Sequence, residues 1–276
     1  MLCARAHPRG APRRADRTRL SQIRFTGERL HDDQPLFAVD LARHRAAYEF
    51  AAERVTGARV LDLGCGGGSG TALLARAGAR VVGVDRVAPD AENRAAGAAF
   101  CRAEIAGLPF RARRFDAVVS FQVIEHLADP APYLRAIGAL LAERGIALLS
   151  TPNRQLSDGV NPYHVREYLG AELHELLARH FAEVTVFGVG MTGPVRDYLS
   201  ARSRRIQRVM RLDPLRLRDR LPRAWVETLF AWGALLVRSA TARTEGTPDA
   251  TWRDFPVGRA DDATSLDWLA VCRGPR

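Results

Sequence analysis

Lysine is absent from this sequence of 276 residues, so all 41 residues counted as lysine or arginine are arginine. A phosphate-binding P-loop needs the lysine of its Gly-Lys-Ser/Thr segment, so the sequence excludes that class of nucleotide-binding enzyme. Arginine without lysine, in an alanine-rich chain, is also typical of a biased base composition in the genome. The net charge of +10 therefore does not by itself indicate an acidic partner.

Cysteine is scarce, and long apolar runs are absent. The four cysteines, Cys3, Cys65, Cys101 and Cys272, lie far apart in the sequence and form no Cys-x-x-Cys pair. This excludes a disulfide framework and a zinc site, and it fits a reducing cytoplasm. No apolar run reaches the roughly 20 residues that a membrane-spanning helix needs.

The basic charge lies at the two ends of the chain. Residues 1–20 hold six arginines and one aspartate, residues 21–190 hold 19 arginines and 20 acidic residues, and residues 191–276 hold 16 arginines and 10 acidic residues. The first segment contains prolines and no apolar stretch of the secretory kind, so we expect a disordered basic tail there. A hydrophobic content of 47% predicts one domain with an elaboration.

The most informative segment is a short apolar run that glycines follow at once. Residues 60–63 predict a buried strand, five glycines follow from Gly64 to Gly70, and residues 71–76 predict the start of a helix. Such a corner lets the backbone approach a nucleotide ligand at the helix N-terminus. Asp62, at the end of the strand, would repel a pyrophosphate but suits a cation. It therefore favours S-adenosylmethionine (SAM), which carries a sulfonium and an ammonium group, over NAD.

The glycine spacing differs from that of dinucleotide-binding enzymes. Their fingerprint places glycine first, third and sixth, whereas Ser69 is the sixth residue counted from Gly64. The run from Asp62 to Gly68 instead resembles the Asp-x-Gly-x-Gly-x-Gly motif of class I SAM-dependent methyltransferases. A glycine-rich loop without a ligand is the alternative, although so many glycines are costly in backbone entropy.

Two further acids fall at the distances that this resemblance leads us to expect. Residues 80–85 predict a second strand that ends in Asp85, where a carboxylate accepts hydrogen bonds from the ribose hydroxyls. Ala103 and Glu104 stand in a segment similar to Gly-Asp-Ala-x-x-Leu-Pro-Phe of the family, whose acid takes the adenine amino group. The resemblance implies SAM as cofactor and the following contacts: Asp62, Gly64, Cys65, Gly66, Gly68, Asp85, Arg86, Ala103, Glu104, Phe121 and Gln122.

Strands and helices alternate from about residue 38 to residue 190, which predicts βαβ units and a mainly parallel sheet. We expect helices over residues 39–55, 130–143 and 169–180, and later strands near 98–101, from 115, over 145–150 and over 181–189. The resemblance implies an α/β, Rossmann-like, doubly wound sheet of seven strands. Its core spans residues 21–189, and its antiparallel seventh strand lies in residues 265–276.

Residues 190–264 are then an insertion between strands six and seven. It leaves the sheet at the edge that holds the ligand crevice, so we expect a mostly helical cap over the acceptor pocket. Trp225, Leu229, Trp232 and Leu236 recur in it at helical spacing, beside many arginines. A peripheral membrane contact, a clamp on an anionic substrate and a dimer interface are the alternatives for these residues.

Two histidines are candidate catalytic residues. Methyl transfer depends on positioning, and a hydroxyl acceptor also gains from a general base. His126 and His164 follow strands four and five, where they act either as the base or as braces of their loops. The turn Glu125-His126 resembles that of ubiquinone-biosynthesis O-methyltransferases, some of which hold a divalent cation with a Glu-x-x-Glu-His set. Gln122 replaces the first acid, and an amide is a poorer ligand for such a cation, so no metal is expected.

Residues 150–154 and 161–167 resemble a bacterial branch of the family that is associated with glycan and cell-surface biosynthesis. The expected activity is O-methylation of a small-molecule or glycan hydroxyl, in secondary metabolism or at the cell surface. A second possibility is an RNA methyltransferase that uses the basic insertion, although no nucleic-acid recognition module accompanies it. A third is a SAM-binding protein without turnover. The branch implies four acceptor contacts, Glu125, Asn153, Tyr163 and Arg166.

Two other methyltransferase classes do not fit. Enzymes that methylate planar amides carry an Asn/Asp/Ser-Pro-Pro-Tyr/Phe segment after strand four, where this sequence has Phe121-Gln122-Val123-Ile124. Cytosine-C5 enzymes need a Pro-Cys pair, and the sequence contains none.

Overall fold

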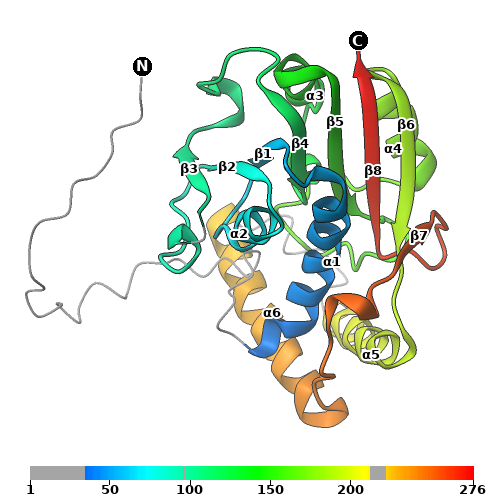
Figure 1. The fold of residues 1–276 in the computed structure, drawn as a ribbon. Coiled ribbons are helices and arrows are strands. Elements are labelled where there is room, and N and C mark those ends of the chain that lie inside the picture. The colour runs from blue at the N-terminus through cyan, green and yellow to red at the C-terminus, as the bar shows by residue number, and fades with distance from the viewer. Residues whose placement is uncertain (1–34, 96, 212–221) are drawn as a thin grey trace, which may run out of the picture.

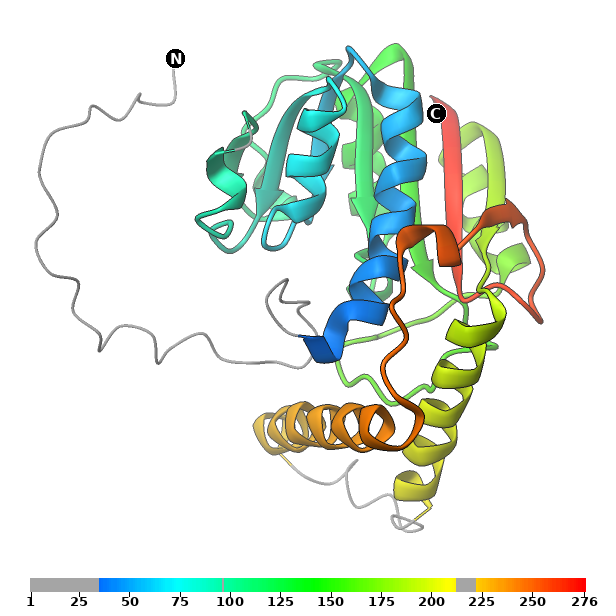
Figure 2. The same cartoon turned by 60° about the horizontal axis from the view of Figure 1, so that its bottom comes forward.

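The computed structural model describes residues 35–95, 97–211 and 222–276 (Figure 1). The basic tail expected at residues 1–20 lies outside these ranges. The described residues form one sheet with helices on both faces, and two helices of the insertion lie beyond one end of that sheet (Figures 1 and 2). None of these helices is long and apolar enough to cross a membrane.

The sheet has eight strands in the order β3-β2-β1-β4-β5-β8-β6-β7. The first five strands in this order are parallel to one another, whereas β8 is antiparallel to both of its neighbours. The strands are β1 (Arg59–Leu63), β2 (Arg80–Asp85), β3 (Ala99–Arg102), β4 (Phe115–Phe121), β5 (Leu141–Pro152), β6 (Phe181–Val189), β7 (Val257–Arg259) and β8 (Asp267–Pro275).

The helices cover the sheet in two layers, each with its own hydrophobic core. The α-helices are α1 (Ala38–Val55), α2 (Ser69–Arg76), α3 (Ala131–Leu140), α4 (Gly170–Ala178), α5 (Gly193–Met210) and α6 (Arg223–Glu245). Short 3-10 helices are η1 (Pro35–Phe37), η2 (Asn93–Ala95), η3 (Ile105–Gly107), η4 (Ile124–His126) and η6 (Trp252–Asp254). Helices α1 and α2 pack on one face of the sheet, and α3 and α4 pack on the other.

The burial of the sheet on both faces explains the apolar strand sequences. In β1, Val60 faces the layer of α1 while Leu61 faces the layer of α3, because successive side chains of a strand point to opposite faces. Both faces are buried, so the strand reads as an uninterrupted apolar run. The Rossmann-like α/β fold with an antiparallel last strand is thereby confirmed.

The structure corrects the sequence prediction at three places. The helix expected over 130–143 ends at Leu140, because Leu141 is buried and pairs with Phe115 at the start of β5. The last strand begins at Asp267 and not at Ser265. An eighth strand, β7, pairs with the outer edge of β6 and satisfies backbone groups that an edge strand leaves open.

Candidate active site

A cavity of about 1560 Å³ lies where the parallel strands β1, β2 and β4 end. The glycine-rich loop after β1, the loops after β2, β4 and β5, the first turns of α1, and helices α5 and α6 all line it. Ligands of open α/β sheets bind at this edge, where the strand order reverses beside β1. The two inserted helices therefore share a cavity with the motif that predicted nucleotide binding.

The glycine-rich loop is fixed by backbone hydrogen bonds to β2. The amide of Gly64 donates to Val84 O at 2.8 Å, and the amide of Gly66 donates to Asp85 Oδ2 at 2.9 Å. Gly64, Cys65 and Gly66 line the cavity, but Gly68 does not. Gly68 adopts φ +89° as the N-cap of α2, so its role is the left-handed turn into the helix and not a cofactor contact.

Asp62 has a different role from the one that the sequence suggested. Its carboxylate is fully buried outside the cavity lining, and it accepts hydrogen bonds from Thr71 Oγ1 at 2.6 Å and from Tyr48 Oη at 3.1 Å. Burial raises its pKa to about 7. The expected direct contact with a cationic cofactor is therefore corrected, because Asp62 instead joins β1 to α1 and α2.

The other expected cofactor residues line the cavity. These are Asp85, Arg86, Ala103, Glu104, Phe121 and Gln122. Asp85 Oδ1 also accepts the amide of Val87 at 3.0 Å, so two backbone amides hold its carboxylate in place. Gln122 adopts φ +56° and donates to Asp267 Oδ1 at 3.2 Å.

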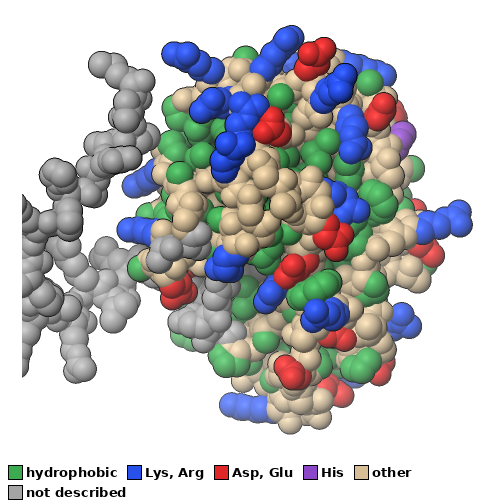
Figure 3. Space-filling model, in the orientation of Figure 1, with side chains coloured by type: hydrophobic (Ala, Val, Ile, Leu, Met, Phe, Trp, Pro, Cys, Tyr) green, Lys and Arg blue, Asp and Glu red, His purple; other side chains and the backbone are tan. Residues whose placement is uncertain are grey.

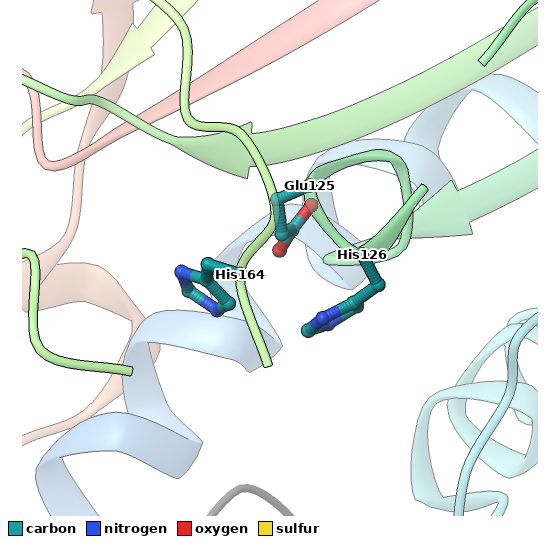
Figure 4. A group of neighbouring side chains, drawn as sticks. All are labelled: Glu125, His126 and His164. Atoms are coloured by element: carbon teal, nitrogen blue, oxygen red, sulfur yellow. The ribbon is translucent and has the colours of Figure 1, made fainter. Parts of the chain in front are cut away.

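His126 and His164 meet in the cavity although 37 residues separate them (Figure 4). Their ring centroids lie 5.1 Å apart, and Figure 4 shows Glu125 beside both rings. His126 Nδ1 lies 3.0 Å from Tyr163 O, and His164 Nδ1 lies 2.6 Å from Glu167 Oε1. Each ring is thus oriented through Nδ1.

Glu125 is fully buried, whereas the two histidines are partly exposed. Thr151 Oγ1 donates to its Oε2 at 3.0 Å, while Oε1 has no hydrogen-bond partner among the described residues. Burial raises its pKa to about 8. Its backbone oxygen accepts the amides of Val165 and Arg166, which holds the loop of His164 against it.

Glu125, His126 and His164 can also share a metal ion. Each offers one ligand atom, and these atoms lie within 4.8 Å of one another. Histidine ligands typically donate their other ring nitrogen to a carboxylate or carbonyl oxygen, as both rings do here. The expectation of no metal rested on Gln122, but the structure supplies His164 as a third ligand in its place.

Two of the four expected acceptor residues lie outside the cavity. Glu125 and Tyr163 line it, whereas Asn153 and Arg166 do not. Asn153 is buried and donates to the backbone oxygens of Asp262 and Ser265, so it braces the approach to β8. Arg166 is exposed, with its guanidinium 5.0 Å from the ring of Tyr168. Their contacts with an acceptor stay predictions.

A polar group on α1 and at the start of β8 was not predicted. Arg43 and His44 of α1 line the cavity, and Arg43 donates to the carboxylate of Asp267 and to Leu266 O at 3.2 Å. Burial lowers the pKa of His44 to about 4, so this ring is neutral at pH 7. The place of Asp267 could have been predicted from the sequence. An antiparallel last strand begins at the edge where the parallel strands end, and Asp267 is the first residue of that strand.

The inserted helices present apolar side chains to the cavity. Arg202 and Arg238 also line it, but both bind the carboxylate of Asp40 from α1, at 2.9 and 3.1 Å. Trp225 and Trp232, which were expected to line or rim the pocket, are 66% and 65% exposed and are not part of its wall. Arg202 and Arg238 thus share one carboxylate, so this part of the lining keeps a net positive charge.

Comparisons with known proteins agree with the fold and the motif. A family model described as a methyltransferase domain matches residues 37–189. A probable S-adenosylmethionine-dependent methyltransferase of Mycobacterium tuberculosis is 34% identical over 201 residues, which cover 69% of this chain and 73% of that protein. A mitochondrial ubiquinone biosynthesis O-methyltransferase of Arabidopsis thaliana is 35% identical over 125 residues, 42% of this chain and 39% of that protein.

A solved structure shows the same fold. A SAM-dependent methyltransferase of Thermotoga maritima, described as a possible histamine N-methyltransferase, matches with a TM-score of 0.54 at 13% identity. The match covers 86% of this chain and 91% of that one, and at this identity it supports the architecture alone. The motif, the cavity beside it and the similarity over most of the chain agree on SAM as the cofactor. The chain belongs to the class I SAM-dependent methyltransferases.

Proposed function

We propose that this enzyme methylates a hydroxyl group of a small molecule or glycan, in secondary-metabolite or cell-surface biosynthesis. The observation that carries the proposal is the pair of oriented histidine rings in the same cavity as the glycine-rich loop. A general base at this place suits an alcohol, which loses a proton as its oxygen attacks. The described cysteines Cys65, Cys101 and Cys272 are free thiols, which fits the proposed cytoplasmic location.

The cofactor side of the cavity fits SAM. Backbone of Gly64 to Gly67 lines it, and at Gly66 an added Cβ would meet no atom within 4 Å, so open space borders the loop. The carboxylates of Asp85 and Glu104 are acceptors on the same wall, at the places proposed for the ribose hydroxyls and the adenine amino group. When bound, SAM supplies an electrophilic methyl group and a neutral thioether leaving group.

His164 is the better placed base of the two. Its Nδ1 edge faces Glu167, whose Oε1 also accepts a hydrogen bond from Ser157 Oγ at 2.8 Å. Burial alone would raise the pKa of Glu167, but the contacts from His164 and Ser157 hold it below its usual value. In this proposal Nε2 of His164 takes the acceptor proton, and the Glu167 carboxylate stabilises the imidazolium that forms.

The test is transfer from labelled SAM to fractions of a host extract, followed by identification of what gains label. We expect His164→Ala to remove most activity and His126→Ala to reduce it, with SAM affinity measured by calorimetry nearly unchanged in both. Full activity in the double variant, or label on RNA alone, would contradict the proposal. On the face of the molecule drawn in Figure 3, arginines lie dispersed among acidic and apolar side chains. They do not form there one basic patch of the kind that would suit RNA.

One observation favours a metal-assisted version of the same reaction. Ligand atoms of Glu125, His126 and His164 lie close enough to one another to bind one metal ion. A divalent ion there would bind the acceptor hydroxyl and lower its pKa. Glu125→Gln distinguishes the two versions, because glutamine keeps an acceptor for Thr151 but is a weak ligand. Activity that survives both this substitution and a chelator supports the histidine base alone. Loss in both, restored by magnesium in the unsubstituted enzyme, supports the metal.

We further propose that α5 and α6, within the insertion of residues 190–264, form the cap of the acceptor site. The support is that α5 and α6 line the cavity that the histidines enter. Replacing the insertion by a short glycine–serine hairpin is expected to preserve SAM binding and to abolish acceptor methylation. Methylation at an undiminished rate in such a variant would leave membrane contact or dimerisation as the better explanation of the insertion.

A further inference from the structure

The cavity is larger than a cofactor requires, and α5 and α6 form part of its lining. Ligand pockets for drug-sized molecules measure roughly 300–1,000 Å³, whereas this cavity measures about 1560 Å³. We call the part of its lining that belongs to α5 and α6 the α5–α6 wall. Its large apolar side chains are Leu199, Ile206, Val209, Met210, Val226, Leu229, Phe230 and Val237, which are aliphatic except for Phe230.

The polar side chains of the α5–α6 wall are already engaged. Arg202 and Arg238 share the carboxylate of Asp40, and Ser203 donates to the carboxylate of Asp158. A polar ligand group that lay against the apolar side chains of the wall would lack hydrogen-bond partners, which disfavours a sugar there. An aliphatic chain needs none.

The α5–α6 wall joins the histidine cluster to the protein surface. At its inner end the ring of Phe230 lies 6.4 Å from the ring of Tyr163, whose backbone oxygen contacts His126. Val209 of α5 and Leu229, the residue before Phe230 on α6, are 54% and 57% exposed although they also line the cavity. An elongated ligand can therefore reach from the solvent to the histidines along an apolar surface.

We propose that the α5–α6 wall binds the aliphatic chain of an amphipathic acceptor, whose hydroxyl end lies at His126 and His164. The inference rests on the proposed O-methyltransferase activity and narrows its substrate class to a polar head on an apolar tail. Its support is the contact of the wall with the histidine cluster, the cavity volume beyond that of a cofactor, and the eight large apolar side chains of the wall.

The test uses β-glucosides with methyl, octyl and dodecyl chains, each below its micelle concentration, in calorimetry with the full-length protein. We expect affinity to rise about fourfold for each added methylene group that reaches the wall. Gly233 of α6 lines the cavity, and an added Cβ there would meet no atom within 4 Å. Gly233→Leu is therefore expected to weaken dodecyl glucoside at least tenfold. The control is Trp232→Gln on the outer face of α6, with no expected change.

Retained SAM binding shows that a variant is folded, and Val237→Thr serves as a second wall variant, expected to weaken dodecyl glucoside severalfold. Affinity independent of chain length, or an equal loss in Trp232→Gln and Gly233→Leu, would overturn the proposal. Transfer from SAM to a purely polar acceptor, without chain-length dependence, would overturn it while leaving the O-methyltransferase activity intact. Chain-dependent binding without transfer to any hydroxyl would sink the proposed activity instead.

Discussion

Asp40 holds the inserted helices to the core, and its replacement should loosen them. Its carboxylate comes from the first turn of α1 and accepts hydrogen bonds from Arg202 of α5, at 2.9 and 3.0 Å, and from Arg238 of α6, at 3.2 Å. All three side chains are largely buried. Asp40→Asn would keep the shape of this junction and remove the charge that balances two arginines.

The expected cost follows from the burial and the pKa. Burial alone would raise the pKa of Asp40, but Arg202, Arg238 and Arg43 together lower it from 3.8 to about 2. A shift of this size corresponds to about 2 kcal/mol in favour of the charged form. Removing one partner of a buried pair costs about 3–5 kcal/mol, because the other charge stays behind. We expect the free energy of unfolding to fall by about 3 kcal/mol, and Tm by about 6–12 °C.

Asp116 supplies a matched control. Its pKa is also lowered to about 2, by hydrogen bonds from Arg59, but its side chain is 40% exposed and solvent screens the pair. Asp116→Asn should therefore cost less than about 1 kcal/mol. Urea and thermal unfolding at pH 7 compare the two variants, and hydrogen exchange reports whether α6 opens first. Equal costs for Asp40→Asn and Asp116→Asn would refute the reasoning.

The pH dependence gives a second check on the same junction. A carboxyl group with a depressed folded pKa stabilises the protein above its unfolded pKa, near 4, and this contribution is lost as the pH falls towards 2. The difference in stability between the wild type and Asp40→Asn should stay constant from pH 7 to pH 5. It should shrink below pH 4, where protonation of Asp40 produces the same imbalance as the substitution.

Three further changes have defined outcomes. Asp85→Ala should weaken SAM binding by about 1.5–3 kcal/mol for each lost charge-assisted hydrogen bond. Calorimetry of the wild type that shows NAD binding and no SAM binding would contradict this. Gly70→Ala would place a Cβ 2.1 Å from the ring of Tyr48, so thermal unfolding should show a loss of about 1–3 kcal/mol; unchanged Tm would count against the packing argument. Glu167→Gln should lower kcat and spare the SAM dissociation constant if it positions His164, and kinetics with the identified acceptor would decide.

Most of the fold could be predicted from the sequence, because local patterns of apolar and polar residues determine it. Strands β2 and β6 have the predicted bounds, since each is an apolar or alternating run that ends at a polar residue or glycine. The short strand β7 was not predicted, because residues 257–259 carry no strand pattern and pair only where β6 offers an open edge. The end of α3 was misplaced for a similar reason, since Leu141 is apolar in either state.

The role of a site residue could be predicted where its contacts lie within its own motif. It could not be predicted where a residue distant in the sequence binds its side chain. Asp62 occupies the motif position of a cofactor contact, yet Tyr48, 14 residues earlier on α1, takes its carboxylate instead. Nothing within the motif signals this partner. Asp40 and Arg43 were missed because a helix pattern shows which face is apolar, but not that its first turns border a cavity closed by α5 and α6.

The chemistry of the histidine cluster depends on a loop that the motif does not contain. Gln122, the residue that argued against a metal, points away to Asp267, so its identity does not decide what Glu125 and His126 can bind. The deciding residue is His164, which the backbone oxygen of Glu125 draws into place through the amides of Val165 and Arg166. Two backbone hydrogen bonds thus hold the loop that brings a third candidate ligand to Glu125 and His126.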